Sequence, residues 1–282
     1  MLKQRVITAV VLLLILLPAL FYPSPQPFCA LALVLVAAGG WEWARLNGAQ
    51  GSAALLWGAA VVGLCAVAWW AGALARPLTP LWLLSACVWV LGGAWLLGTG
   101  PAGWSRLPKA LRLACGPLVL AVAWLAIAQA KVLGTNFLLS VLLLVWVADI
   151  FAYFAGRALG GRFFKQKLAP SISPGKSWEG VWGGMAGVLL MAFIWQAMDA
   201  RLQATVPSLY THLFASGWWV MVLAAVFMAA MSVVGDLVES LMKRSAGAKD
   251  SSNLLPGHGG VLDRLDALLP TLPLAMMLLQ VA

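Results

Sequence analysis

The sequence has little charge for its length and few polar side chains. Only 10% of its 282 residues are charged and 63% are hydrophobic, and the mean hydropathy is +0.94. Its apolar runs reach the roughly 20 residues that a helix needs to cross a bilayer. These values exclude a soluble globular protein.

Cysteine is scarce too, and no two cysteines form a C-x-x-C pair. The four cysteines lie singly inside apolar runs, at Cys29, Cys65, Cys87 and Cys115. This spacing indicates neither a disulfide framework nor a thiolate metal site, so we interpret them as small core or lipid-facing residues. No internal repeat and no soluble domain is visible.

Hydropathy predicts an all-α integral membrane protein, a polytopic bundle of about nine transmembrane helices. The expected spans are residues 6–22, 27–40, 53–75, 78–98, 114–130, 135–154, 180–197, 217–236 and 264–281. The second span is short, so it is either re-entrant or extended by Trp41 and Trp43, whose rings suit the interface. The first resembles a signal peptide, but no convincing cleavage site follows it, and we expect a retained span.

The distribution of basic residues predicts a cytoplasmic N-terminus. With that orientation, fifteen of the eighteen Lys and Arg residues fall inside, and Arg76, Lys131 and Arg201 fall outside. Such asymmetry is what the positive-inside rule requires. The net charge of +9 is then mainly an orientation signal, although a basic cytoplasmic face also attracts anionic lipid and nucleotide.

Acidic residues are concentrated in the second part of the chain. Of the nine, only Glu42 precedes residue 149. We therefore expect one transmembrane domain, with a motif-free helical half (1–130) and a catalytic half (131–282). Three predicted helix ends carry acids to the cytoplasmic face, at Asp149, Asp236, Asp263 and Asp266. A carboxylate at membrane depth is costly unless it is paired or ligated, so these acids predict a shared site.

The eighth predicted helix carries polar groups on one face. Asp236, Glu239, Ser240 and Lys243 stand at i, i+3, i+4 and i+7, which places two acids, a hydroxyl and a cation together. The alternative is simple pairing of acids and bases at the level of the lipid headgroups. The recurrence of both charges over about thirty residues favours a functional site.

Two cytoplasmic loops, 157–179 and 237–263, contain glycines beside basic residues. In the second, Lys249 and Asp250 precede a Pro-Gly-His-Gly-Gly turn (256–260), whose backbone N–H groups can cradle an anion. In the first, a Ser-Pro-Gly-Lys-Ser stretch (173–177) precedes a helix N-terminus, which also suits a phosphate. An ordinary basic loop that touches anionic lipid is the alternative. Pro170 occupies the place of the first glycine of a P-loop, which disfavours a Walker-type ATPase.

The run from Ser240 to Asp266 resembles, over 27 residues, the signature of the phosphatidate cytidylyltransferases, the CDP-diacylglycerol synthases. Segments 149–157 and 173–180 also resemble parts of this family. One departure is Gly175, which takes the place of the first of two consecutive basic residues after Ser-Pro.

The resemblance implies transfer of a cytidylyl group from CTP to phosphatidate, which gives CDP-diacylglycerol and pyrophosphate with Mg²⁺; a second metal or a monovalent ion stays open. The implied metal ligands are Asp236, Asp263, Asp266 and Glu239. The implied catalytic residues are Lys243, Arg244, Lys249, Asp250, His258 and Arg264. The implied substrate-binding residues are Asp149, Ser173, Lys176, Glu179, Ser240, Gly259 and Gly260.

The expected partners are CTP, phosphatidate and membrane lipid, with no nucleic acid, and a homodimer stays open. The expected location is a bacterial inner membrane with the site on the cytoplasmic side. One alternative is a transporter for an anionic solute, which would favour midplane polar groups and repeats. Another is a different lipid-phosphate transferase, although the D-G-x-x-A-R pattern of CDP-alcohol phosphotransferases is absent.

Overall fold

The computed structural model describes residues 2–282, and these form helices and connections without a strand. The main helices are α1 (Leu2–Phe21), α2 (Gln26–Leu46), α3 (Gly51–Trp70), α4 (Thr79–Cys87), α5 (Gly93–Arg106), α6 (Lys109–Leu133), α7 (Thr135–Leu159), α8 (Trp178–Leu202), α10 (Trp218–Ser245) and α12 (Leu268–Val281). Shorter helical segments are η1 (Ala73–Ala75), η2 (Val88–Gly92), α9 (Leu209–Ala215) and α11 (Leu262–Leu265).

Among these residues, eight helical segments are long and apolar enough to cross a bilayer, and Val6–Phe21 in α1 is a shorter apolar helix. The predicted polytopic all-α membrane protein is thus confirmed. Of the two alternatives for the second span, the extended helix is correct, because α2 continues past Trp41 and Trp43 to Leu46.

Several predicted boundaries are wrong. The fourth span does not end at 98: α4, η2 and α5 run on as one segment, Thr79–Arg106, through a π-helical turn and a kink at Gly100 and Pro101. The third span ends at Trp70, before η1, because Gly72 takes a left-handed conformation. The short helix α9 was not predicted, since seven residues are too few for a hydropathy signal.

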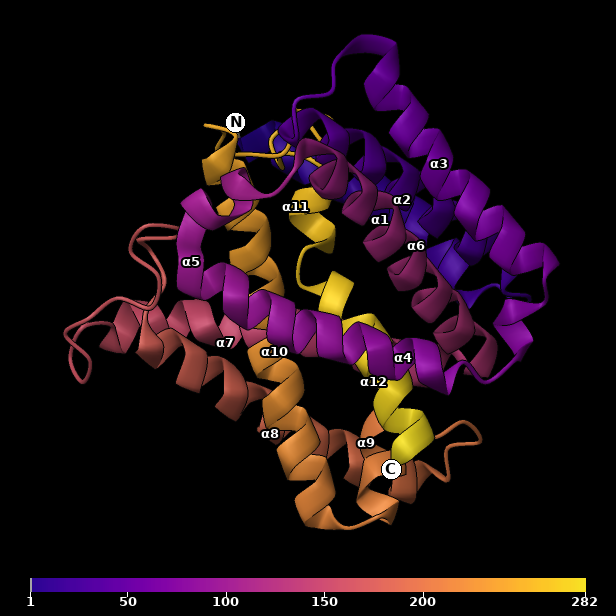
Figure 1. Ribbon diagram of the computed structural model, residues 1–282. Coiled ribbons are helices and arrows are strands. Elements are labelled where there is room, and N and C mark those ends of the chain that lie inside the picture. Colours follow the sequence, from indigo (N-terminus) through magenta and orange to yellow (C-terminus); the bar gives the residue numbers. More distant parts are fainter. Residues whose placement is uncertain (1) are drawn as a thin grey trace.

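Long-range hydrogen bonds sort the connections between helices into two groups at opposite ends of the bundle. At one end lie the start of α1 and the connections 47–50, 107–108, 160–177 and 246–261. Hydrogen bonds link Thr8 to Pro256, Lys109 to Gly48 and Arg244 to Ile172 there. The other end joins the connections after α1, α3, α6 and α8, through Lys131 to Leu20, Gln129 to Arg76 and Asn136 to Asp199. The N-terminus lies with the first group and the C-terminus lies at the far end (Figure 1).

The close pairing of α7 and α8 depends on small residues. A Cβ added at Gly184 would lie 2.8 Å from the Ala148 carbonyl oxygen, and one at Gly180 would lie 3.0 Å from that of Ala152. Such stripes of glycine and alanine let membrane helices approach closely. The two helices run side by side and bring the loop between them against α10 (Figure 1).

A second close approach joins α10 to the start of the C-terminal span. Gly235 faces the Asp266 carbonyl oxygen and the Pro270 ring, and a Cβ there would lie 2.4 Å from that oxygen. Only glycine allows this contact without a shift of the backbone. As a result, Asp236 of α10 lies beside the break between α11 and α12.

Candidate active site

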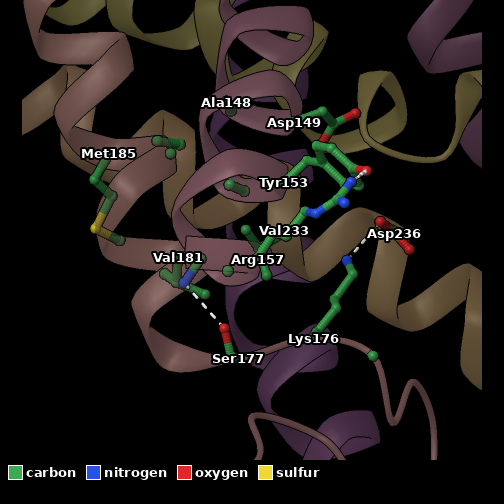
Figure 2. Close-up of a pocket in the computed structure, with 16 residues that line it drawn as sticks. Ala148, Asp149, Tyr153, Arg157, Lys176, Ser177, Val181, Met185, Val233 and Asp236 are labelled. Carbon is green, nitrogen blue, oxygen red and sulfur yellow. Dashed lines mark hydrogen bonds and ion pairs between the residues drawn. The ribbon is translucent and has the colours of Figure 1, made fainter. Parts of the chain in front are cut away.

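A cavity of about 440 Å³ lies between α7, α8, α10 and the loop before α8. Small and apolar residues make up most of its wall, for example Ala148, Gly184 and Val233. Its polar groups are Asp149, Tyr153 and Arg157 from α7, Lys176 and Ser177 from the loop and Asp236 from α10 (Figure 2). The cavity thus combines an apolar wall with charges of both signs.

Lys176 and Asp236 form an ion pair across this cavity. The Lys176 Nζ lies 2.5 Å from Asp236 Oδ2, and the Ser240 hydroxyl donates to Asp236 Oδ1 at 3.3 Å. The loop is held in place because Ser177 caps α8, where its Oγ accepts from the Gly180 N–H at 3.2 Å. Three predicted residues, Lys176, Asp236 and Ser240, are therefore in contact.

Asp149 and Asp266 complete this acidic group. Asp149 lines the same cavity as Asp236, and the backbone of Asp266 packs against Gly235, the residue before Asp236. Three separate helical elements contribute these acids, namely α7, α10 and the α11–α12 break. We call Asp149, Asp236 and Asp266 the carboxylate cluster.

A second, more buried group surrounds Lys243, about two turns beyond Asp236 along α10. Its Nζ lies 2.6 Å from Glu239 Oε2 and 2.5 Å from Asp263 Oδ1. Asp263 Oδ2 accepts from the backbone N–H groups of Ser251 and Gly260 and from the Ser251 hydroxyl. The predicted metal ligands therefore divide: Asp236 and Asp266 belong to the carboxylate cluster, whereas Glu239 and Asp263 bind Lys243.

The glycine-rich turn closes over Asp263. Gly259 has φ +86°, and a Cβ there would lie 2.8 Å from Asp263 Oδ2. The turn is pinned by a backbone hydrogen bond from Leu255 to Gly259 and by Arg264, whose Nη2 donates to the His258 carbonyl at 2.7 Å. In this structure Gly260 donates its N–H to Asp263, and Gly259 allows the turn to approach that carboxylate closely. Their predicted contact with substrate stays a prediction.

Lys249 and Asp250 do not line the first cavity. They line a second, polar cavity of about 420 Å³ beside Arg45 and the hydroxyl groups of Ser251 and Ser252. Both side chains are exposed, so they are accessible to a soluble ligand.

Three other predicted residues hold the loop before α8. Glu179 is buried, and its Oε1 accepts from the backbone N–H groups of Gly161, Phe163 and Phe164. Arg244 Nε donates to the Ile172 carbonyl, and Ser173 bonds through its backbone to Ala169. Their observed contacts are with the protein itself, and their predicted roles toward substrate stay predictions.

Sequence reasoning missed Glu42 and Ser251. Glu42 of α2 is fully buried and accepts hydrogen bonds from four groups of the connection between α10 and α11, including the Ser251 hydroxyl. A signal was present, because Glu42 is the single acid in the first 148 residues and stands in an apolar helix. Glu42, in the half predicted to be motif-free (1–130), therefore holds residues 251–262 of the signature in place.

Metal binding was tested against the observed donor atoms. Among residues 2–282, no group of three or more His, Cys, Asp or Glu side chains is already arranged as a metal site. Asp263 is occupied by Lys243 and by N–H donors, which fits a metal poorly, whereas Glu239 contacts Lys243 through Oε2 and its buried Oε1 has no hydrogen-bond partner among the described residues. The carboxylate cluster fits better, because its ion pair of Lys176 with Asp236 is partly exposed and can exchange partners, and its carboxylates are the hard oxygen ligands that Mg²⁺ prefers.

Comparison with known proteins places this site in a family. A sequence model described as "Cytidylyltransferase family" matches residues 3–282. The chain belongs to this family. A phosphatidate cytidylyltransferase of Pseudomonas aeruginosa is 40% identical over 289 residues, which cover 100% of this chain and 98% of that protein.

Two further relatives in this cytidylyltransferase family carry the same name. The Haemophilus influenzae protein is 38% identical over 97% of this chain and 96% of its own length, and the Brucella abortus protein is 35% identical over 95% and 89%. The resemblance found in the signature therefore extends over the whole chain. Membership in an enzyme family disfavours the transporter alternative.

Proposed function

We propose that this cytidylyltransferase transfers the cytidylyl group of CTP to phosphatidate, which yields CDP-diacylglycerol and pyrophosphate for phospholipid synthesis. The observation that carries this proposal is the ion pair of Lys176 with Asp236, beside Asp149, at a cavity with a mainly apolar wall. Such a cavity suits a substrate whose phosphate is charged and whose acyl chains are not. The names of the full-length relatives give independent support.

The reaction needs charge neutralisation more than it needs a base. An oxygen of the phosphatidate phosphate attacks the α-phosphorus of CTP. A P–O bond forms there while the bond to the β-phosphate oxygen breaks, and pyrophosphate leaves with that electron pair. The nucleophile is already anionic, so the main barrier is repulsion between two polyanions, which fixed cations reduce. Lys176 and Arg157 line the cavity and would supply this positive charge.

Magnesium would bind at the carboxylate cluster, with Asp236 and Asp266 as ligands and Asp149 as a third. When bound, it neutralises phosphate charge and aligns the phosphate groups. Lys176 must then release Asp236 Oδ2, which leaves its ammonium group for a phosphate oxygen. Both side chains are partly exposed, so this exchange of partners requires no opening of the core.

The two substrates would reach the site by different routes. Phosphatidate would enter the apolar cavity between α7, α8 and α10 from the lipid. CTP would approach from water through the polar cavity that Arg45, Lys249 and Asp250 line. The excess of Lys and Arg at this end of the bundle supports a cytoplasmic location for it, where CTP is present.

The test is a direct assay of the purified protein. Incubation with radiolabelled CTP, phosphatidate and Mg²⁺ should give a labelled, lipid-soluble product and an equal amount of pyrophosphate. Diacylglycerol in place of phosphatidate is the matched control, because it lacks the nucleophilic phosphate. Absence of product from the wild-type protein across several detergents and lipids would contradict the proposal.

A further inference from the structure

Both carboxylate oxygens of Glu42 accept hydrogen bonds from the signature segment, residues 240–266. Its Oε1 accepts from the Ser252 hydroxyl at 2.5 Å and the Val261 N–H at 2.9 Å. Its Oε2 accepts from the Leu262 N–H at 2.6 Å and the Ser251 hydroxyl at 3.1 Å. All four donors lie in a stretch of twelve residues, more than 200 residues from Glu42 in sequence.

Because Glu42 is buried, its carboxylate favours a conformation of the signature segment that supplies hydrogen-bond donors. The side chain is 0% exposed, and no Lys, Arg or His forms a salt bridge with it in the described part of the chain. A buried carboxylate without a cation is costly unless hydrogen bonds satisfy it. The segment is therefore held in the one conformation that supplies four donors. Gly260 is needed for this closure, because a Cβ would lie 2.5 Å from Glu42 Oε1 and 2.0 Å from Ser251 Oγ.

The contact continues from Glu42 to the charged groups of the site. The Ser251 Oγ lies 2.9 Å from Asp263 Oδ2 and 3.1 Å from Glu42 Oε2, so its single O–H is shared between the two carboxylates. Asp263 Oδ1 in turn contacts the Lys243 ammonium group. A displacement of the signature segment at Glu42 would thus move Asp263 and change the position of Lys243.

We propose that Glu42 is a positioning residue for cytidylyl transfer, which acts through Ser251 and Asp263 to fix Lys243. This inference rests on the proposed function, and it assigns a part in the site to a helix of the N-terminal half. Glu42 does not line the first cavity, and its hydrogen-bond partners in the described part of the chain are Ser251, Ser252, Val261 and Leu262. Its loss should lower kcat through Lys243 and should also raise the KM for CTP, because Ser251 and Ser252 line the second cavity.

The test compares Glu42→Gln with Asp199→Asn as a matched control. Asp199 is also a buried carboxylate with three hydrogen-bond donors, Asn136, Ser208 and Thr211. It lies in the last turn of α8, at the other end of the bundle from the residues that Glu42 holds. Both variants should lose similar thermal stability in detergent. Glu42→Gln should lower kcat about 100-fold, the scale of a misplacement of about 1 Å. Asp199→Asn should keep kcat within about twofold, since it lies outside the coupled network. Equal kcat in the two variants would overturn the proposal.

Two further measurements test the route and the fold. The double variant Glu42→Gln/Ser251→Ala should lose less activity than the product of the two single losses, because both act through the same hydroxyl group. Hydrogen exchange of residues 248–262 should rise in Glu42→Gln and in Gly260→Ala but not in Asp199→Asn. Independent, multiplicative losses or unchanged exchange would overturn the proposal. Wild-type activity reports separately on the proposed function, and the exchange data can be read even if that activity is absent.

Discussion

The ammonium group of Lys176 contacts Asp236 across the cavity and so joins the loop before α8 to α10. The side chains are 26% and 30% exposed, so water screens the pair and it contributes at most about 1 kcal/mol to stability. Its importance is therefore expected to lie in catalysis.

We expect Lys176→Ala to lower kcat/KM by about 100-fold, the typical loss of one donor that stabilises transition-state charge. Thermal stability should change little. Lys165→Ala is the control, because it removes the same charge from an exposed position in the same loop. If the Lys176 and Lys165 variants were equally active, Lys176 would have no special role.

The carboxylate cluster predicts which acids govern the need for metal. Removal of divalent ions with EDTA should abolish activity, and added Mg²⁺ should restore it. Asp149→Asn and Asp266→Asn should raise the Mg²⁺ concentration for half-maximal activity, because each removes a hard oxygen ligand.

Asp263→Asn provides the contrast for this experiment. It should lower stability and kcat without a comparable change in the Mg²⁺ requirement, since Asp263 binds Lys243 and backbone N–H groups. If Asp263→Asn raised the Mg²⁺ requirement more than Asp149→Asn and Asp266→Asn did, Asp263 would be a metal ligand, as the sequence alone implied.

Lys243 should matter for stability as well as for catalysis. Its side chain is 12% exposed and lies between Glu239 and Asp263, which are 1% and 7% exposed. Lys243→Met leaves two buried carboxylates without a cation, and we expect a loss of about 3–5 kcal/mol, seen as a lower Tm in detergent. Adding Glu239→Gln should recover part of this loss, and Lys249→Met, at an exposed position, should cost almost nothing. A stable Lys243→Met variant would contradict this view of the network.

The sequence was sufficient to predict the spans, because bilayer thickness fixes the length of an apolar helix whatever its neighbours are. It was also sufficient to place Asp236 beside Ser240, which stands four residues further along the same helix. It could not pair Glu239 and Asp263 with the same lysine rather than with a metal, since both arrangements need the same residues. Nor could it connect Glu42 to Ser252, because hydropathy carries no information on contacts between distant segments.

The small-residue contact of α7 and α8 predicts a different kind of defect. Gly184→Leu should push α7 away from α8, because even a Cβ would lie 2.8 Å from the Ala148 carbonyl oxygen. Asp149 and Lys176 would then separate, so activity and Tm should both fall. Gly63→Leu in α3 is the control, because a Cβ there meets nothing within 4 Å. A fully active Gly184→Leu variant would argue against this contact.

The orientation of the chain can be tested with single cysteines in a variant whose four native cysteines are replaced. Lys165 and Thr205 are exposed positions in the connections before and after α8, a helix long enough to cross the bilayer. A membrane-impermeant maleimide added to intact spheroplasts should label Thr205→Cys and should label Lys165→Cys only after permeabilisation. The reverse pattern would put the carboxylate cluster on the side that lacks CTP, and the proposed reaction could not then take place.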